Sequence, residues 1–469
     1  MKLQGSLSLK LVLVLTIGLA LIGSPLLAQQ PNQPDVQHLL QKIQELQQQL
    51  ATQQQHNMAL QQKLEELQNT VSALANTQKK QDEAIQQMPE KLAEVSPVKP
   101  GGHEKITIKG FISSTFYSQD QNFAFSNGQA AEFPVGSQFT TNKWFSGGDV
   151  RNTRLDIGFS GPKLANWTSG GLVETDFFGG FNGSGAFSHQ QPYMRLRLAY
   201  IQLDKPGTRI RIGQDWSPLF GEWPVSSSHI AFPLGYGSAG FVGWRFPGFY
   251  LWHDLSAKGA RTKTQLQVGV FEGSWSGPGD NVNGGTAGNV SFRPQVEARL
   301  NFSQKHWKIY VVGHWDQKDL KGANDINPMP AITDKITGTA FEIGGMVTPG
   351  NWLIHGNAYW GKGIGQQFGA ITQFGDISSN GAWLQVGYNF TKNWSLYGFY
   401  GYENPNDQDV MDWVGANGRT KNQMYNLHLR YAIGPYWFGL EWLHDKVDLG
   451  TAGNSVKGNQ LAASWRYVF

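Results

Sequence analysis

From residue 104 to the end of the chain, apolar and polar residues alternate with a period of two in one segment after another. Neighbouring side chains of a β-strand point to opposite faces, so this alternation predicts strands with one apolar and one polar face. The segments are about ten residues long, which is the length that a tilted strand needs to cross a bilayer. Turn-forming residues separate them and delimit sixteen predicted strands, at 105–117, 151–160, 171–179, 192–203, 208–216, 244–254, 261–272, 292–302, 306–316, 335–347, 351–361, 381–391, 393–402, 421–433, 435–446 and 458–469.

The connections between these strands alternate between short and long. Turns such as "DKPG", "SQK" and "TK" alternate with long segments at 118–148 and 274–291. This asymmetry is typical of outer-membrane barrels, which have short periplasmic turns and long outer loops. A β-propeller would show a repeat of about 40 to 50 residues, and none is present. A β-sandwich of this size would usually be split into domains. The sequence therefore predicts an all-β transmembrane barrel of sixteen antiparallel strands over residues 104–469. Because the number of strands is even, the first and the last strand are expected to have their free ends on the periplasmic side.

The composition fits this class and argues against several others. Charged residues make up 16% of the chain, compared with about 25% in a typical soluble domain. The formal net charge is only +3, without a Lys/Arg cluster, which argues against nucleic acid as a partner. The chain has no cysteine, which excludes disulfides and thiol chemistry. No H-E-x-x-H or G-x-S-x-G motif is found, so we predict no enzyme activity, no cofactor and no metal site.

The first 28 residues have the features of a cleaved signal peptide. Lys2 and Lys10 precede an apolar run of 13 residues at 11–23, and Ala28 offers a cleavage position. A membrane anchor is the alternative, but the run is short for a spanning helix. No later segment approaches about 20 consecutive apolar residues, so we expect no transmembrane helix after it.

Residues 29–92 are rich in glutamine, with apolar residues at a regular spacing. With Ile43 at position a of a heptad, ten of twelve a and d positions between 36 and 74 are apolar. A strict 3.5-residue period predicts a coiled coil rather than an isolated amphipathic helix. Gln53 and Asn57 interrupt the apolar seam, where polar residues fix register and strand number. A linker at 93–103 follows. The segment predicts self-association, and these residues leave dimer and trimer open.

Along each predicted strand, the odd-numbered and even-numbered positions differ in chemistry, and we call this the parity of a position. Charged side chains share one parity, for example Arg154 and Asp156 against Leu155 and Ile157, so they are expected to line a lumen. By the same rule Leu198 and Tyr200 are expected to face lipid. Interfacial girdles are expected from Phe116, Tyr117, Trp216, Trp244, Trp315, Trp352, Trp360, Tyr431 and Trp437. The predicted lumen residues are Arg154, Arg195, Arg197, Arg209, Arg211, Arg293, Arg299, Arg430, Arg466, Glu174 and Asp176.

These lumen arginines allow two interpretations. In the first, they pair with nearby acids and brace the wall, and we expect this of about half of them because buried charges are usually paired. In the second, they form a ladder that guides anions, because a guanidinium binds carboxylate or phosphate with two hydrogen bonds. Rows of fixed charge set the selectivity of pores.

A long connection follows the fifth predicted strand, at about 217–240. It is rich in aromatic residues, Pro and Gly, which suits a segment packed inside a barrel better than a solvated loop. We expect it to fold into the lumen as a constriction, with Trp216, Glu222, Trp223 and His229 as its functional residues. The alternative is an ordinary extracellular loop.

Several motifs in residues 150–230 resemble a known family. The segments "TRLDIGF", "ETDFFGG", "RLRLAY" and "GQDWSPLF" are similar, in this order, to the DcaP-like porins, a dicarboxylate-type group of trimeric sixteen-stranded channels. The resemblance implies a homotrimer, a third loop that narrows the pore, and an arginine-lined passage through Arg154, Arg195, Arg197, Arg209 and Arg211. Asp156 departs from the family pattern and would enter the lumen beside Arg154. Phosphate-selective porins also combine a coiled coil with a barrel, but no inward rows of lysine are found here.

The function expected from these features is passive diffusion of small anions such as dicarboxylates across an outer membrane. The alternative is a structural protein that tethers the outer membrane to the cell wall through its coiled coil. The closing segment "GNQLAASWRYVF" ends on Phe469, which resembles the signal by which barrel-assembly machinery recognises its substrates. Expected partners are two further copies of the chain, lipid and lipopolysaccharide, that machinery, and peptidoglycan.

Overall fold

The computed structural model describes residues 105–125, 127–135, 144–180, 190–273, 293–321, 333–450 and 454–469. It also describes residues 41–42, 61–63 and 65, which are helical. The predicted signal peptide, most of the predicted coiled coil and the linker lie outside the described residues. The chain divides into two units, Met1–Lys99 and Pro100–Phe469, and the second is described here by itself. Among the described residues, no helix is both long enough and apolar enough to cross a membrane.

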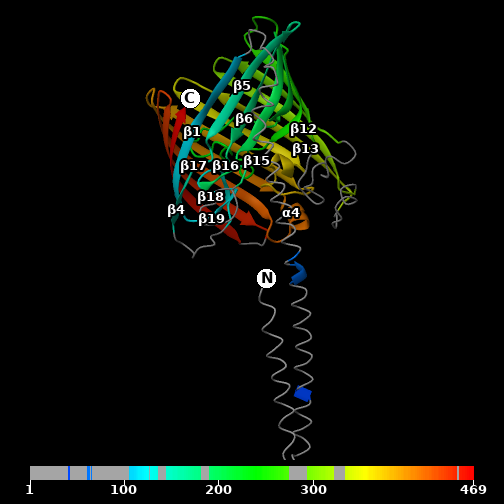
Figure 1. Ribbon diagram of the computed structural model, residues 1–469, viewed down its shortest axis with the longest axis vertical. Helices are drawn as coiled ribbons and strands as arrows, with labels where there is room; N and C mark the ends of the chain where they lie inside the picture. The colour runs from blue at the N-terminus through cyan, green and yellow to red at the C-terminus, as the bar shows by residue number, and fades with distance from the viewer. Residues whose placement is uncertain are drawn as a thin grey trace, which may run out of the picture. The chain divides into compact units, whose positions relative to one another are not determined.

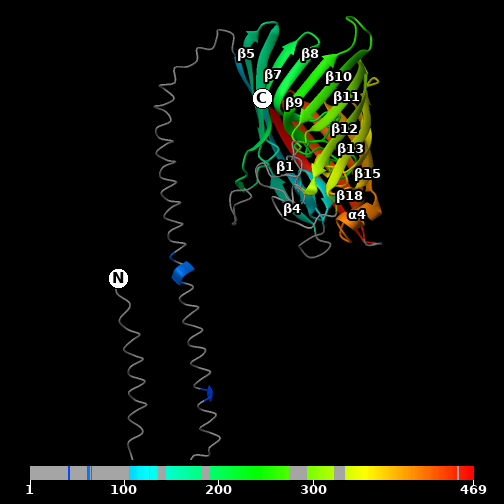
Figure 2. The same ribbon diagram turned by 90° about the vertical axis from the view of Figure 1, so that its right-hand side faces the viewer.

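The second unit is a closed antiparallel barrel with sixteen strand positions around its wall, as the alternation predicts (Figure 1). We call each position a stave. β1 pairs with β19 along one edge, which closes the sheet, and with β4 and β5 along the other. β4 and β5 together form one interrupted stave, and every other wall strand pairs with its neighbours in sequence. Figure 2 shows strands from this run side by side. The wall strands are β1 (Lys105–Gln119), β4 (Phe145–Asp149), β5 (Arg154–Leu164), β6 (Trp167–Asp176), β7 (Arg195–Lys205), β8 (Thr208–Trp216), β9 (Arg245–Asp254), β10 (Lys263–Phe271), β11 (Gln295–Gln304), β12 (Trp307–Asp319), β13 (Lys335–Val347), β14 (Trp352–Lys362), β15 (Ser378–Asn389), β16 (Trp394–Pro405), β17 (Arg419–Ile433), β18 (Tyr436–Leu449) and β19 (Ser455–Val468).

The two ends of the barrel differ in their connections. The short turns lie at the end where β1 begins and β19 ends, and we call this the turn end. The long connections lie at the opposite end, the loop end. One of them contains the hairpin of β2 (Phe123–Phe125) and β3 (Ala131–Pro134), called the inner hairpin below. Another contains the short helix α4 (Asp407–Trp413), which Asn406 caps by accepting a hydrogen bond from the backbone N–H of Asp409. The 3-10 turn η2 (Gly365–Gln367) lies between β14 and β15.

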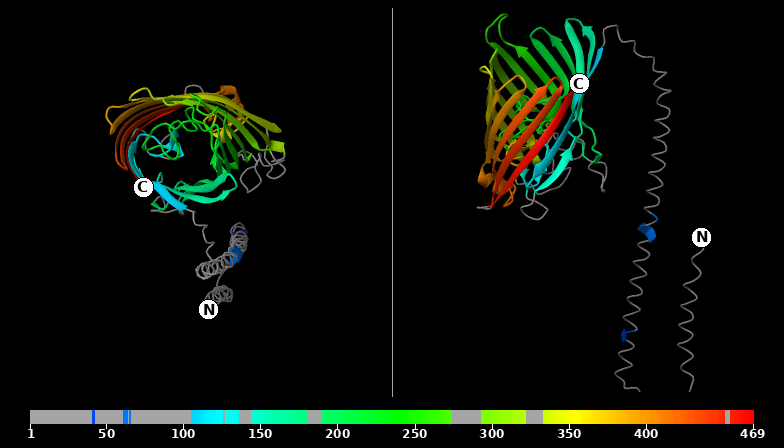
Figure 3. Two further views of the ribbon diagram at one scale, coloured as in Figure 1. Left: turned by 90° about the horizontal axis from the view of Figure 1, so that it is seen from above. Right: turned by 90° about the vertical axis from the view of Figure 1, so that its left-hand side faces the viewer.

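Residues 217–244, called the inner loop below, connect β8 to β9 and are mostly buried. Seen from above, the green inner loop and the cyan inner hairpin lie inside the ring of strands (Figure 3). Together they form an aromatic cluster in the lumen. Its buried residues include Phe123 of the inner hairpin, and Phe220, Phe232, Tyr236 and Phe241 of the inner loop. The wall contributes inward side chains to the same cluster, among them Trp383, Phe399 and Leu443.

The alternation of faces is regular in most strands but fails in β7. The pairing of β6 with β7 shifts between Glu174 and Thr175, so Arg197 and Leu198 together occupy a β-bulge. Leu198 is therefore buried, and the parity of the following residues is reversed. The expectation that Leu198 and Tyr200 face lipid is wrong: Tyr200 packs under the guanidinium of Arg211, 4.1 Å from it.

The aromatic girdle is also distributed differently from the prediction. Tyr117, Trp216, Trp244 and Trp437 are not part of it, because they pack on the inward side of the barrel. Every exposed Trp or Tyr inside a described wall strand belongs to β12–β19: Trp315, Trp352, Trp360, Trp394, Tyr400, Tyr425, Tyr436, Trp442, Trp465 and Tyr467. On β1 and β4–β11 the large exposed hydrophobic residues are aliphatic or Phe. We call these two surfaces the girdled face and the aliphatic face.

Candidate pore and its lining

The inner loop is fixed to the girdled side of the wall by one carboxylate. Glu441 of β18 accepts hydrogen bonds from the backbone N–H groups of Ser227 (2.6 Å) and Ser228 (2.8 Å), and from the hydroxyl of Ser226 (2.8 Å). The hydroxyl of Ser227 also lies 2.9 Å from Nε2 of His428 on β17. A carboxylate that accepts several hydrogen bonds is a strong anchor, because each charge-assisted bond is about twice as strong as a neutral one.

A second anchor lies where the wall is interrupted between β4 and β5. The side-chain amide of Asn152 donates to the carbonyl of Ser228 (2.6 Å) and its oxygen accepts from the N–H of Ala231 (3.0 Å). Beside it, the hydroxyl of Thr153 accepts from the N–H of Ser113 on β1 and lies 3.3 Å from the carbonyl of the same residue. The Thr153 side chain thus replaces a ladder partner that the interrupted stave does not supply.

Further anchors come from β11 and β15. The carboxylate of Glu297 accepts from the N–H of Leu219 (2.6 Å), and Arg299 donates to the carbonyls of Pro218 and Phe220. Gln385 bonds both the N–H and the carbonyl of Val225. The inner loop is therefore held from several sides of the barrel. Gly240 allows the inner loop to lie directly against β15, since a Cβ at this position would be 2.5 Å from the backbone nitrogen of Ala382.

The four residues predicted for the constriction all lie at the inner loop. Trp216 stacks on Phe220 with ring centroids 3.8 Å apart, and Trp223 packs edge-on against both rings. Glu222 forms an ion pair with Lys308 of β12 and lies 3.8 Å from Arg299.

His229 is buried and joins the inner loop to the inner hairpin. Its Nε2 accepts a hydrogen bond from the N–H of Ala131, and its Nδ1 lies 2.9 Å from the hydroxyl of Ser228. Burial lowers the pKa of His229, so the ring is neutral, with its proton on Nδ1. The residue acts in this structure as a connector between two lumen segments.

The arginines of the β5–β7 wall are paired with acids. Arg197 donates to Glu174 (2.5 Å) and to Asp176 (2.7 Å), and Arg195 binds both oxygens of Asp176. Arg154 lies 3.7 Å from Glu174. Asp156, the departure from the family pattern, forms no ion pair within 4 Å in the described part of the chain. The three arginines therefore share two carboxylates.

Other predicted arginines are paired one to one. Arg209 binds Asp204 (2.7 Å) and Arg211 binds Asp215 (2.8 Å). Arg293, a predicted lumen residue, lies before β11 at the loop end, where it donates to Gln317 (2.6 Å) and pairs with Asp319 (3.0 Å).

Arg430 and Arg466 have no acidic partner among the described residues. Arg466 lies 3.6 Å from the ring centroid of Trp437 and 5.2 Å from that of Phe111. Arg430 lies 4.8 Å from Trp437 on one side, and Arg154 lies 5.3 Å from Phe111 on the other. The arginine–aromatic row therefore alternates Arg430, Trp437, Arg466, Phe111 and Arg154 across five adjacent staves. Inward parity alone could have indicated both rings. The sequence interpretation missed Phe111 and placed Trp437 in the girdle.

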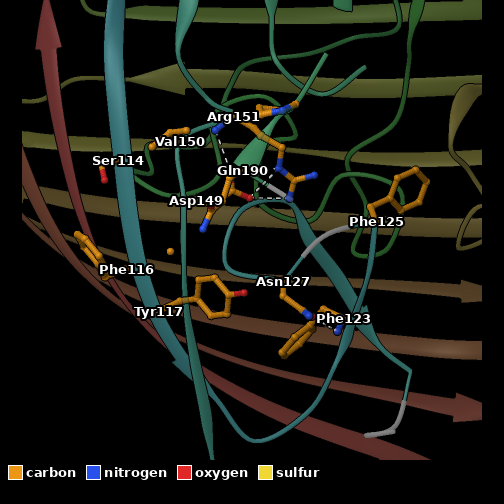
Figure 4. Close-up of a pocket in the computed structure, with 12 residues that line it drawn as sticks. Ser114, Phe116, Tyr117, Phe123, Phe125, Asn127, Asp149, Val150, Arg151 and Gln190 are labelled. Carbon is orange, nitrogen blue, oxygen red and sulfur yellow. Dashed lines mark hydrogen bonds and ion pairs between the residues drawn. The ribbon is translucent and has the colours of Figure 1, made fainter. Parts of the chain in front are cut away.

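A cavity of about 750 Å³ lies at the interruption between β4 and β5 (Figure 4). Ser114, Phe116 and Val150 line it from the outward face, and Tyr117, Phe123 and Phe125 from the inward side. Arg151 reaches into it and binds both oxygens of Asp149. The cavity therefore lies where the pairing of β1 passes from β4 to β5, and residues from both faces of the sheet line it.

No group of three His, Asp or Glu side chains in the described ranges is placed to hold a metal ion. The inward side chains include guanidinium groups, aromatic rings and neutral hydrogen-bonding groups, together with carboxylates such as Glu174, Glu297 and Glu441. The guanidinium groups of such a lining can bind and orient anions.

Comparison with known proteins supports the fold. The structure is similar to that of the outer membrane channel DcaP of Acinetobacter baumannii, with 16% identity over 79% of this chain and 98% of that chain, and a TM-score of 0.59. It is also similar to the anion-selective porin from Comamonas acidovorans (12% identity, 78% and 100% coverage, TM-score 0.52). A complex of Salmonella typhi OmpF with daunomycin matches at 11% identity, 78% and 98% coverage and a TM-score of 0.50.

No model of a protein family matches the sequence, and no curated protein matches it. The fold and the closed barrel define a sixteen-stranded transmembrane barrel of the outer-membrane porin type. The resemblance to DcaP-like channels seen in the sequence is confirmed at the level of this fold.

Proposed function

We propose that this chain forms a passive diffusion channel in an outer membrane, with a preference for small anions. The observation that carries the proposal is the arginine–aromatic row, in which Arg430 and Arg466 are half-buried, inward and without an acidic partner in the described part of the barrel. Their charge is not cancelled locally, so it acts on whatever enters the lumen.

The aromatic members of the row explain how two such arginines can be held in place. Trp437 and Phe111 lie between successive guanidinium groups and attract each of them through the ring face. An acid in the same place would orient the arginine equally well but would neutralise it. Stacking therefore fixes the side chains without neutralising their charge.

The inner loop supports a size limit for the pore. Its aromatic cluster, with Trp216, Trp223 and Phe220, fills part of the cross-section, and Glu441 and Glu297 anchor the loop to the wall. We infer that Trp216, Glu222, Trp223 and His229 belong to the constriction, where Glu222 tempers the positive charge of Lys308 and Arg299.

The solutes we propose are small carboxylates, with dicarboxylates as the leading class. A planar carboxylate matches the fork of an arginine and accepts two parallel hydrogen bonds from it. A dicarboxylate could engage two guanidinium groups of the row at once.

Planar-bilayer electrophysiology of the purified protein tests the proposal. In a KCl gradient the reversal potential should indicate chloride preference, and Arg430→Met combined with Arg466→Met should reduce that preference by roughly fivefold. Arg261→Met, which removes one positive charge from an exposed turn between β9 and β10, is the matched control for a single charge. Cation preference in the unmodified channel would overturn the proposal.

We also propose that the channel is a homotrimer whose subunits meet along the aliphatic face. Trp and Tyr favour the lipid headgroup region, and no exposed Trp or Tyr lies inside a described strand of this face, although Trp144 and Tyr193 lie beside its strands. A face with few such residues is suited to contact protein instead of lipid. Small outward residues on this face, such as Ser118, Ser146 and Gly148, allow close approach of a second backbone. Lipid and lipopolysaccharide would then cover the girdled face.

A tether to the cell wall is the second candidate, and the predicted coiled coil at 29–92 favours it. This segment would lie in the periplasm, clamp the trimer and be available to peptidoglycan, while Phe469 would serve recognition by the barrel-assembly machinery. Deleting residues 30–98 should lower the melting temperature of the trimer without changing the ion selectivity of the pore. An unchanged melting temperature would remove the clamp from the proposal.

A further inference from the structure

Another cavity, of about 390 Å³, lies between the inner loop and the turn-end half of the wall. Phe220, Gly221 and Glu222 line it from the inner loop, and side chains of β9–β12 line it from the wall. Asp254 and Lys263, which line its turn-end side, are exposed, so solvent reaches the cavity from that side. Its volume lies within the range of about 300–1,000 Å³ that is usual for small-molecule sites.

The wall side of this cavity is rich in neutral hydrogen-bonding side chains. Gln267 lies opposite Trp252 in the pairing of β9 with β10, and Gln265 lies opposite Asn301 in the pairing of β10 with β11. Ser303 follows on the inward parity of β11. We call the three amides and this hydroxyl the amide patch. All four side chains line the cavity and are half-buried, so they are held by the wall and still face the solvent in the lumen.

The neutral groups of the amide patch are less committed to partners than the charged groups beside them. Arg299 donates to two carbonyls of the inner loop and to Oδ1 of Asn301, and it lies 3.8 Å from Glu222. By contrast, the side chains of Gln267 and Ser303 form no hydrogen bond within the described residues. Three basic and two acidic side chains line the cavity, so its net charge is small. The groups left to bind a solute here are therefore mainly neutral donors and acceptors.

Trp252 supplies an apolar surface next to the amide patch. It lines this cavity and an adjoining one of about 350 Å³, while Arg211 lies over its ring, 5.1 Å from the centroid. Gln265 donates to Asp254 (2.9 Å), whose carboxylate can also accept from a hydroxyl. A sugar ring has apolar C–H groups that pack against an indole, and hydroxyls that both donate and accept. A carboxylate only accepts, so it would use half of what the amides offer.

We propose that the amide patch and Trp252 form a binding site for a neutral, polyhydroxylated solute of the size of a monosaccharide. Such a solute packs one face of its ring against Trp252 and exchanges hydrogen bonds with Gln267, Asn301 and Ser303. The inference goes beyond the proposed function, because it adds an uncharged class of solute to the anions. It requires an open pore, but it does not depend on the charge preference of that pore.

Titration of the single-channel conductance with D-glucose, at equal KCl on both sides of a planar bilayer, tests this site. Glucose should lower the conductance saturably. Triethylene glycol dimethyl ether, which is uncharged and has no hydroxyl, should lower it only as far as it lowers the conductivity of the bulk solution. Gln267→Leu combined with Ser303→Ala should raise the half-saturating glucose concentration by about tenfold, because two hydrogen bonds are lost.

These two substitutions should not impair folding, since neither side chain has a partner in the described part of the barrel. Asn389→Leu, which removes an exposed amide at the turn end of β15 outside the cavity, is the matched control and should leave the half-saturating concentration unchanged. Trp252→Leu should also weaken the effect of glucose, and the double variant decides alone should Trp252→Leu fail to fold.

Two results would overturn the inference: a conductance that follows only the bulk conductivity, or a half-saturating concentration that is the same in the double variant. The reversal potential in a KCl gradient without glucose separates this site from the proposed function. Chloride preference without a saturable effect of glucose rejects the sugar site alone. Cation preference with a saturable effect of glucose rejects the anion preference alone.

Discussion

Glu132 of the inner hairpin illustrates how one residue can make a lumen segment sensitive to pH. It is buried on β3, and neither of its carboxylate oxygens has a hydrogen-bond partner among the described residues. Arg419 on β17 attracts it, whereas Glu403 on β16 and Asp445 on β18 repel its ionised form; Tyr236 of the inner loop is also close. Burial, the largest influence, raises the pKa of Glu132 well above its ordinary value of 4.5.

The sign of the resulting pH dependence follows from this raised pKa. The docked hairpin holds a neutral Glu132, so docking is fully favoured below the ordinary pKa and is weakened as pH rises toward the raised one. We expect single-channel conductance to increase as the pH rises above the ordinary pKa of 4.5 toward the raised one, because the hairpin then leaves the lumen. Glu132→Gln should remove this dependence. A conductance of the variant that still rises with pH would assign the effect to another group.

Glu441 allows a second prediction at the residue scale, because it accepts three hydrogen bonds from the serines of the inner loop. Glu441→Gln keeps the shape but turns an amide toward N–H donors, and we expect the loop anchorage to weaken by about 1.5–3 kcal/mol. Open-channel current noise should increase while the melting temperature of the barrel changes little. Asp448→Asn on the same strand, whose carboxylate pairs with Lys446, is the control. Noise equal to that of the unmodified channel would contradict this anchoring role.

At the scale of elements, the interrupted stave of β4 and β5 depends on one hydroxyl. Thr153 meets both the N–H and the carbonyl of Ser113, a residue fully buried in the wall. Thr153→Val preserves the shape and leaves these two groups unpaired, which should destabilise the barrel by about 1–3 kcal/mol. Thr153→Ser should restore most of the loss. Equal unfolding midpoints in urea for all three proteins would show that water or movement of β1 satisfies the same groups.

The elements themselves were predictable because a period of two is a direct consequence of strand geometry. All sixteen staves were anticipated, and so was the inward parity of Arg154, Glu174 and Arg430. Parity fails where one residue is inserted, and the bulge at Arg197 and Leu198 therefore misplaced Tyr200. The bulge moves the outward apolar positions of β7 from the parity of Leu196 to that of Ile201, and a single parity assigned to the whole strand does not allow for this change.

The lining of the pore was predictable only in part. Local alternation could place an arginine in the lumen but not identify its partner, because Asp176, Arg195 and Arg197 meet across strands. The aromatic residues were harder still: Trp437 stands at a strand end like a girdle residue, yet packs on Arg466 inside.

At the scale of the whole molecule, the wall has two chemically different outer surfaces. The girdled face presents Trp and Tyr from β12 to β19, while the aliphatic face of β1 and β4–β11 presents mainly Ile, Leu, Val and Phe in its described strands. A barrel surrounded by lipid on all sides would need the interfacial residues all round. The asymmetry therefore argues that the aliphatic face is covered by protein.

Single cysteines test this assignment, since the natural chain contains none. Val173→Cys on β6 and Leu384→Cys on β15 both replace outward, exposed residues, one on each face. With a small fluorophore attached to each cysteine, brominated lipids in proteoliposomes should quench Leu384→Cys strongly and Val173→Cys at least about tenfold less, because only the first meets lipid. Dissociating the oligomer and returning it to lipid as monomers should make the second as strongly quenched as the first. Equal quenching of both positions in the intact oligomer would mean that the aliphatic face is exposed to lipid, and the proposed subunit contact would then have to lie elsewhere on the barrel.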